Sequence, residues 1–322
     1  MDSQPLSPDQ AAKAGVPPLD PPLLKKRSLV ETWSYLIFLA GLILTTAGPI
    51  LVRLSEVGPV ATAAWRMSLA VPVLALFLYF EPRETRTAGR LQRKDYGLLV
   101  LSGLFLAADI AMWNSSVMLT SVASASFLAN GAPVFVVLLS WLLFKERPTS
   151  LFLLGLLVGV GGSALMMSES LRMSSRNFVG DFLSLAAAGF YACYILTVAR
   201  ARQRASTLTL MTLGSAVSAA VLWMAAPLME SGLVPSTTSG WLVVLAIALL
   251  TQVAGQTLIA LSLGYVPANF SALILLLQPV IPSLAAWVLF NETLSAMQAI
   301  GAVGIVIGLA LARPRSRDNV SS

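Results

Sequence analysis

Two ionisable side chains lie well inside apolar stretches of this 322-residue chain. Arg66 is the only base and Asp109 the only acid placed deep within a run long enough to cross a bilayer. Charged groups are costly in the hydrocarbon core and are therefore kept mainly for binding, ion transfer or pairing. In chemical terms, Arg66 can hold a carboxylate and Asp109 can take up a proton.

Arg66 and Asp109 are expected at one depth in the membrane. Each stands seven residues from the same end of its apolar run, counted to Pro59 and Ser116. At about 1.5 Å of rise per residue, both lie roughly 10 Å below that surface. Two interpretations stay open. One is a structural ion pair, with Arg66 also able to snorkel outward; the other is an outer gate or substrate clamp.

A second group of polar and aromatic side chains is expected near the middle of the membrane. The ordinary role of any one of them is an interhelical hydrogen bond or simple packing. Because several helices contribute such groups at similar depth, they favour a shared cavity. Gln252 and Gln256 share a helix face by their four-residue spacing. The candidates for substrate binding or gating are Arg66, Asp109, Trp113, Asn130, Tyr191, Gln252, Gln256 and Gln278, with Thr45 and Thr46 beside them.

Two prolines are candidates for hinges. Pro133 and Pro279 are expected inside helices, where they leave the carbonyls of Ala129 and Leu275 without their usual partners. A static kink is one interpretation. The other is a pair of matched hinges for alternating access, since exposed backbone is tolerated where it lines a cavity.

The composition excludes most enzyme classes. The chain has no histidine and one cysteine, Cys193, which removes imidazole metal sites, Ser-His-Asp triads, internal disulfides and multi-cysteine centres. No phosphate-binding Gly-Lys-Ser/Thr loop is present. We therefore expect no enzyme activity, no metal and no cofactor. An integral-membrane enzyme that modifies lipids is the rival class, but its usual cluster of acids, histidines or an activated nucleophile is not apparent.

The distribution of charge indicates a membrane protein with many spans. Hydrophobic residues make up 57% and charged ones 11%, against about 25% charged in soluble domains. The net charge of +6 sits between apolar runs, which favours anionic lipids over nucleic acid as partners. Ten helices are predicted: Trp33–Val52, Pro59–Phe80, Tyr96–Ser116, Thr120–Phe144, Ser150–Ser168, Asp181–Ala199, Thr207–Leu228, Gly240–Leu263, Val266–Phe290 and Ser295–Ala312.

The ends of the chain are expected in the cytoplasm. Residues 1–32 are proline-rich and polar, which predicts a disordered tail, and residues 313–322 form a second tail. With both termini inside, 17 of the 21 Lys and Arg residues face the cytoplasm and three face outward. This asymmetry predicts a multi-pass protein of a bacterial-type inner membrane.

An internal repeat becomes visible when the chain is shifted by 146 positions. Between Pro133 and Leu165, 12 of 33 residues match their partners, including a proline, a tryptophan, a glutamate and two glycines. Each copy, 33–168 and 181–312, holds five predicted helices. An odd number forces the second copy to enter the membrane from the opposite side. Inverted halves with a site near the midplane are a common build of secondary transporters.

Several motifs resemble a known family. Gly58-Pro59 with Trp65-Arg66, and the run from Ser126-Phe127-Leu128 to Lys145-Glu146-Arg147-Pro148, resemble the first half of EamA-type drug/metabolite transporters. The run from Ala272 through Gln278-Pro279 to Asn291-Glu292 is similar to the second half. The resemblance implies ten helices, with the fifth and tenth peripheral and the others around a central cavity.

The resemblance also implies an activity. Such proteins move amino acids or other small organic metabolites, usually outward. We expect a secondary active exporter that works by alternating access, driven by a proton or substrate gradient. Multidrug efflux, uptake and exchange remain as alternatives. Gly155-x-x-x-Gly159 and Gly304-x-x-x-Gly308 permit close helix packing, within one chain or across a homodimer, so both monomer and homodimer stay open.

Overall fold

The computed structural model describes residues 21–82, 93–145, 147–172, 178–281, 284 and 295–313, which form helices and short connections with no strand among them. The all-helical prediction is confirmed. The count of ten spans is not established, because the predicted ninth span lies partly outside the described residues. Within the described ranges, eight segments are long and apolar enough to cross a membrane: Trp33–Arg53, Pro59–Phe80, Asp95–Leu119, Ser124–Phe144, Ser150–Ser168, Phe178–Ala201, Thr207–Met229 and Thr238–Ser262. The shorter apolar helices are Ala268–Leu277 and Ala296–Ala312.

Several of these segments consist of more than one helix. The first half contains α2 (Pro21–Thr45), α3 (Gly48–Arg53), α4 (Pro59–Phe80), α6 (Arg93–Leu119), α7 (Val122–Ala129), α8 (Ala132–Phe144) and α9 (Ser150–Arg172). The second half contains α10 (Phe178–Ala201), α11 (Thr207–Met229), α12 (Thr238–Ala246), the π-helix η1 (Ile247–Gln256), α13 (Thr257–Ser262), α14 (Ala268–Ile274), the 3₁₀ turn η2 (Leu275–Leu277) and α16 (Ala296–Ala312).

The start of α2 differs from the expectation of a disordered segment up to residue 32. The helix begins at Pro21, well before the apolar run that starts at Trp33. A helix already nucleated in the apolar part gains one backbone hydrogen bond for each residue added, so it extends into polar sequence. Residues 1–20 and 314–322, the rest of the two expected tails, lie outside the described residues.

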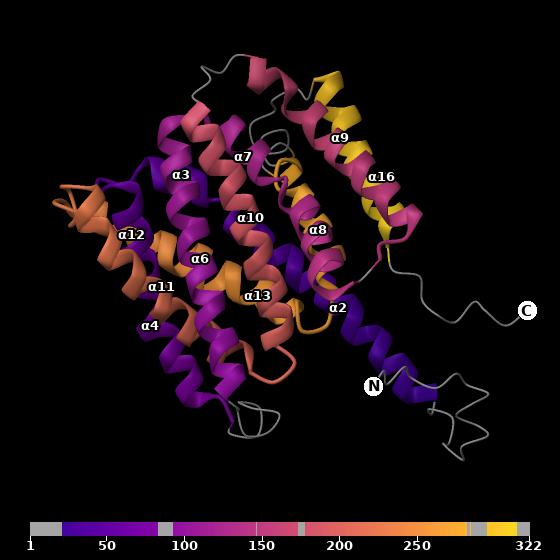
Figure 1. Ribbon diagram of the computed structural model, residues 1–322, viewed down its shortest axis with the longest axis horizontal. Coiled ribbons are helices and arrows are strands. Elements are labelled where there is room, and N and C mark those ends of the chain that lie inside the picture. The colour runs from indigo at the N-terminus through magenta and orange to yellow at the C-terminus, as the bar shows by residue number, and fades with distance from the viewer. Residues whose placement is uncertain are drawn as a thin grey trace, which may run out of the picture.

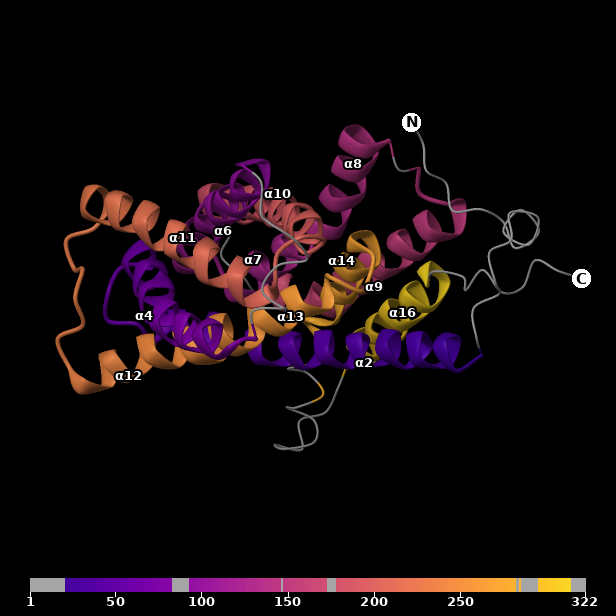
Figure 2. The ribbon, with the colours of Figure 1, turned by 90° about the horizontal axis from the view of Figure 1, so that it is seen from below.

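The helices pair in a two-fold pattern between the two halves (Figure 1). Three helices pack on their own counterparts: α4 on α11, α8 on α14, and α9 on α16. Two further contacts are exchanged by the two-fold relation. The first span (α2) packs on the eighth (η1 and α13), and the third span (α6) packs in the equivalent way on the sixth (α10). Figure 2 shows α2 running along one face of the bundle. A duplicated bundle whose copies are related by a two-fold axis produces this pattern, which agrees with the predicted repeat.

Glycines bring α9 and α16 into backbone contact. A Cβ atom built on Gly155 would lie 2.5 Å from the carbonyl oxygen of Gly308, and one on Gly301 would lie 2.5 Å from that of Gly162. The contacting residue numbers run in opposite directions, so the two helices are antiparallel. The 146-residue shift matches Gly155 with Gly301 and Gly162 with Gly308, which makes each contact the image of the other. The glycines therefore serve packing within one chain.

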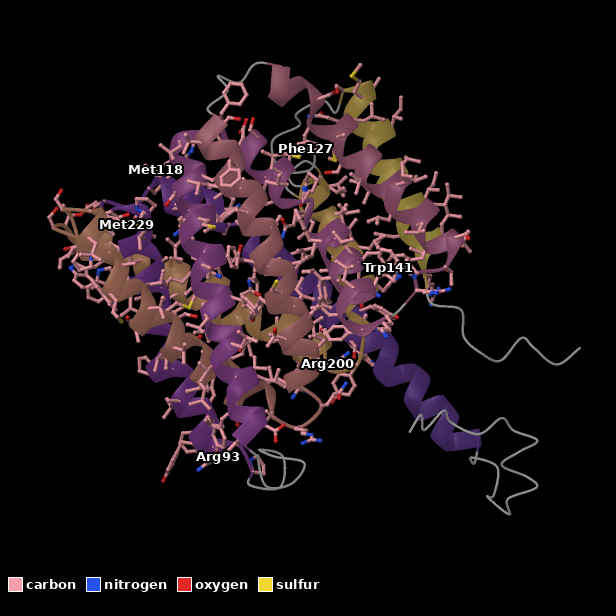
Figure 3. The ribbon with its side chains drawn as sticks, in the orientation of Figure 1. Arg93, Met118, Phe127, Trp141, Arg200 and Met229 are labelled. Atoms are coloured by element: carbon pink, nitrogen blue, oxygen red, sulfur yellow. The ribbon has the colours of Figure 1, made fainter. Side chains whose placement is uncertain are left out.

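One end of the bundle, here called the arginine end, is where α4 and α10 finish and α6 and α11 begin. Figure 3 shows Arg93 and Arg200 toward this end and Met118 and Met229 toward the other. The hydroxyl of Ser206 donates to the Glu81 carboxylate at 2.8 Å, which links the two connections. The described arginines of this end include Arg93, Arg200, Arg202 and Arg204.

At the opposite end, two carboxylates hold the N-termini of helices from the other half of the chain. Glu230, after α11, accepts hydrogen bonds from the backbone N–H groups of Val60 and Ala61 in α4, at 2.7 and 2.9 Å. Glu56 accepts from the hydroxyl and backbone N–H of Thr237, at the start of α12. The hydrogen bonds from Thr237 hold the pKa of the Glu56 carboxyl below its ordinary value. Both carboxylates satisfy helix N–H groups that have no partner within their own helix.

Candidate functional site

A cavity of about 410 Å³ lies between the two halves of the chain. This size falls in the range of small-molecule sites, about 300–1,000 Å³. Most of its lining residues come from helix parts nearer the opposite end, whereas Tyr191 lies near the middle of α10 and Gln256 lies nearer the arginine end. The polar and charged ones are Thr45, Thr46, Arg66, Asp109, Ser126, Asn130, Thr251, Gln256, Gln278 and Gln298, and the aromatic ones are Trp113 and Tyr191.

Interrupted helices build much of the cavity wall. α2 ends at Thr45 and α3 begins at Gly48, with Pro49 as its second residue. α7 and α8 are separated at Asn130 and Gly131. The eighth span changes from α to π geometry in η1, and α14 continues into the tighter η2. Irregular backbone is tolerated at membrane depth where it borders a cavity, and each of these four places contributes lining residues.

The two predicted hinge prolines differ in position from the expectation. Pro133 does not stand in the interior of a long helix but is the second residue of α8, because the chain has already left the preceding helix at Asn130. Pro279 lines the cavity, and Pro133 does not. The Leu275 carbonyl is not left without a partner, since it accepts from the Gln278 N–H at 2.9 Å in the 3₁₀ turn. Their action as hinges stays a prediction.

Arg66 is held from behind by a glutamine of the other half. It is 6% exposed and lines the cavity from α4. Its Nε and Nη2 groups donate to Gln252 Oε1 at 3.2 and 3.0 Å. Gln252 in turn donates from Nε2 to the Ser215 hydroxyl at 3.1 Å. These bonds fix the guanidinium, and its remaining nitrogen, Nη1, makes no hydrogen bond to a described residue.

Asp109 lines the same cavity from α6. The structural ion pair, one of the two interpretations left open by the sequence, is not formed in the described part of the chain: Arg66 bonds to Gln252, and no salt bridge joins Arg66 to Asp109. Arg66 and Asp109 therefore face a shared space, and neither is joined to the other by a salt bridge.

Gln252 and Gln256 have different roles, although their four-residue spacing predicts that they share one face of a helix. Gln252 is fully buried behind Arg66 and does not line the cavity, whereas Gln256 lines it. Both belong to η1, whose wider i→i+5 turns rotate side chains away from the positions that α spacing predicts. The Oε1 atom of Gln256 is buried without a hydrogen-bond partner among the described residues. This oxygen is enclosed by the surrounding residues and is not accessible from the cavity.

The other predicted residues are brought together at the cavity. Asn130 stands at the break between α7 and α8, where its Nδ2 donates to the Ser163 hydroxyl at 3.4 Å. Tyr191 on α10 stacks on Tyr194, with ring centroids 5.8 Å apart. Trp113, Gln278, Thr45 and Thr46 also line the cavity. Seven of the eight candidates for binding or gating thus reach the cavity, and Gln252 supports one of them.

Some lining residues were not predicted from the sequence. Pro49 lies at the break in the first span, and a proline within an apolar run could have indicated this break. Gln298 stands near the start of α16 as a polar residue in an apolar helix. Met166 and Met167 on α9 gave no signal, since apolar side chains that face a cavity and those that face lipid look alike. The resemblance made α9 and α16 peripheral, yet both contribute to the wall.

Comparison with known proteins agrees with this architecture. A protein of Archaeoglobus fulgidus named an uncharacterized transporter is 28% identical over 250 residues, covering 76% of this chain and 86% of that protein. The pseudopaline exporter CntI of Pseudomonas aeruginosa is 28% identical over 243 residues, covering 74% and 82%. One solved crystal structure superposes with a TM-score of 0.69 at 19% identity, covering 87% of this chain and 96% of that one, which supports the fold.

The sequence model of the EamA-like transporter family matches residues 31–168 and 178–313, which include the whole of both predicted repeats. The match covers both halves separately, as the two-fold packing of the helices requires. The expected resemblance to EamA-type drug/metabolite transporters is confirmed. The chain belongs to the EamA-like transporter family.

Proposed function

We propose that this protein is a secondary active transporter that exports small amphipathic metabolites carrying both a carboxylate and an ammonium group, amino acids among them. The observation that carries this proposal is the placement of Arg66 and Asp109 in one cavity without a salt bridge between them. A zwitterionic cargo offers a carboxylate to Arg66 and an ammonium to Asp109. Burial of either charge alone is costly, and opposite charges on the cargo offset that cost.

The site favours a small cargo with a carbon skeleton. Apart from its polar groups, the cavity wall is made by residues such as Ile50, Ile110 and Ala188. The volume of about 410 Å³ suits a molecule of amino-acid size. Export is supported by the relative in Pseudomonas aeruginosa that is named an exporter.

The proposed mechanism is alternating access in an inner membrane with the arginine end in the cytoplasm. Most residues that line the cavity belong to helix parts nearer the opposite end, which supports assigning this structure to the outward-facing state of the proposed cycle. Cargo binds from the cytoplasm in the alternate state and leaves from this one. A proton on Asp109 is the proposed coupling ion, because its uptake removes the charge that holds the cargo ammonium.

The test is transport into proteoliposomes with labelled amino acids, with and without a pH gradient. A set of amino acids is compared with the corresponding amides, which lack the carboxylate, and N-acetyl derivatives, which lack the ammonium. We expect both modified forms to be transported poorly. Arg66→Gln and Asp109→Asn should raise the half-saturating concentration about tenfold or more, since a charged hydrogen bond is worth about 1.5–3 kcal/mol. Arg93→Gln, exposed at the start of α6, is the matched control.

Equal transport of an amino acid and its amide would contradict the role given to Arg66. Unchanged transport by Asp109→Asn, with normal membrane insertion, would contradict both the ammonium contact and proton coupling. Failure of all labelled amino acids with an intact, inserted protein would reject the zwitterion as cargo.

Efflux of organic cations is the second candidate function, and one observation favours it. Asp109 and Trp113 line the cavity one helical turn apart on α6, so a cation held by the carboxylate also lies near an aromatic ring. A substitution of Arg66 distinguishes the two candidate functions. Arg66→Gln should impair transport of a zwitterion but leave transport of a cationic dye intact or improved, because it removes a repelling charge.

A further inference from the structure

The wall formed by α9 and α16 carries two methionines. Met166 is 4% exposed and Met167 is half-buried, and both line the cavity near the end of α9. Helix α16 adds Gln298, whose Oε1 accepts from the Ser295 N–H at 3.0 Å and is thereby fixed to the helix start. The apolar part of this wall is therefore made mainly by thioether side chains.

The glycine contacts between α9 and α16 fix where Met166 lies. A Cβ built on Gly301 would be 2.6 Å from the Met166 nitrogen and 2.9 Å from its Cβ, so only glycine permits this approach. The backbone of Met166 is thus pressed against α16, and its side chain lines the cavity. A wall placed by backbone contact holds its position while the flexible thioether tip adapts to what it meets.

The chemistry of this wall complements the charged groups. Arg66 and Asp109 account for the two charges of a zwitterion, and neither distinguishes one amino acid from another. Methionine packs against apolar and aromatic groups through a polarisable sulfur, with contacts to aromatic rings worth about 0.3–1.5 kcal/mol. A cargo side chain that contacts Met166 and Met167 would be accepted or rejected by its size.

We propose that Met166 and Met167 are specificity-determining residues, which set the size of the cargo side chain that the cavity accepts. This inference rests on the proposed function for the identity of the cargo. Shortening Met166 enlarges the cavity on the side of α9 without touching either charge. The rank order of cargoes changes, while the requirement for a carboxylate and an ammonium remains.

Two experiments test the inference. The first labels Met166→Cys with a water-soluble thiol reagent in a Cys193→Ser background, with Leu157→Cys as control because Leu157 is on the same helix and 74% exposed on the outside of the bundle. We expect Met166→Cys to react much faster. The second compares uptake of a large, aromatic amino acid with that of a small one. Met166→Ala should raise this ratio about tenfold, as pocket size typically discriminates.

The control for the second experiment is Met224→Ala, which makes the same change at a side chain 75% exposed on α11 and should leave the ratio unchanged. If Met166→Cys labels no faster than Leu157→Cys, Met166 does not face the water-filled cavity and the inference is wrong. An unchanged ratio in Met166→Ala with intact transport also overturns it. If the unsubstituted protein transports no amino acid, the proposed function is rejected. The labelling experiment would still show whether Met166 faces the cavity.

Discussion

At the scale of single residues, the central feature is the support of one buried charge by a residue that does not reach the cavity. Gln252 joins Arg66 in α4 to Ser215 in α11. It accepts with its oxygen and donates with its nitrogen, so both ends of the amide are used. The guanidinium is held in one place, and its free nitrogen can meet cargo without first losing side-chain freedom.

Gln252→Leu should weaken binding of carboxylate cargo. The substitution leaves two Arg66 N–H groups and the Ser215 hydroxyl without their partners, at about 1–3 kcal/mol for each buried unsatisfied group. We expect the half-saturating concentration of an amino acid to rise at least tenfold, measured by uptake into proteoliposomes. Gln252→Glu keeps the acceptor and should restore part of the affinity. Equal affinities in Gln252→Leu and the unsubstituted protein would show that Arg66 needs no such support.

The sequence predicts the polar part of this site and misses the apolar part, for a physical reason. Arg66, Asp109 and Gln278 stand out because each breaks an apolar run, and such groups are costly in lipid. Met166 breaks no run, since a methionine is equally suited to lipid and to a cavity wall. The distinct roles of Gln252 and Gln256 depend on π-helical turns, which no pattern of residue types reveals.

At the scale of the elements, the fold depends on two kinds of helix contact: backbone packing and carboxylate capping. The span positions follow from hydropathy and the two repeats from residue matches at a shift of 146 positions, and the family match agrees with the repeats. The interruptions of the spans do not follow so simply. Pro133 suggests a kink, but the chain leaves the helix three residues earlier and starts a new one.

Gly162→Ala should destabilise the α9–α16 pair. The added Cβ would lie 2.6 Å from the carbonyl oxygen of Gly301, so the helices must separate, at about 1–3 kcal/mol. We expect a lower midpoint of thermal unfolding in detergent. Gly161→Ala is the matched control, since no atom beyond its own helix and neighbours lies within 4 Å of a Cβ there. A similar midpoint for the two variants would contradict the packing.

Glu230→Ala should loosen the start of α4. The carboxylate satisfies two N–H groups there, and loss of such a cap costs about 0.5–2 kcal/mol. Gly58→Ala should have the same effect, because its Cβ would collide with the Glu230 carboxylate. Thermal unfolding of both variants and of the double variant provides the test. We expect the double variant to lose no more thermal stability than either single variant. If the losses of stability add up, Glu230 and Gly58 act independently and this expectation is wrong.

At the scale of the whole molecule, the two halves are expected to lie in opposite orientations in the membrane. A single cysteine introduced at Lys145 or at Asn291, in a Cys193→Ser background, can be labelled from either side of intact cells. We expect Lys145→Cys to react only from the cytoplasm and Asn291→Cys only from outside. Labelling of both from one side would remove the inverted repeat and the pathway between the halves. Asn291 lies outside the described residues, so this test rests on the sequence repeat and the helix pairing.

The antiparallel contact of α9 with α16 has a consequence for how such a protein can be assembled. Gly155 meets Gly308 and Gly162 meets Gly301, so the same patch, matched by the repeat, is used on both sides. A surface that recognises its own copy in this way needs no second, separately shaped partner. One five-helix unit therefore already encodes both halves of this junction, and joining two such units into one chain mainly fixes their number and their relative orientation.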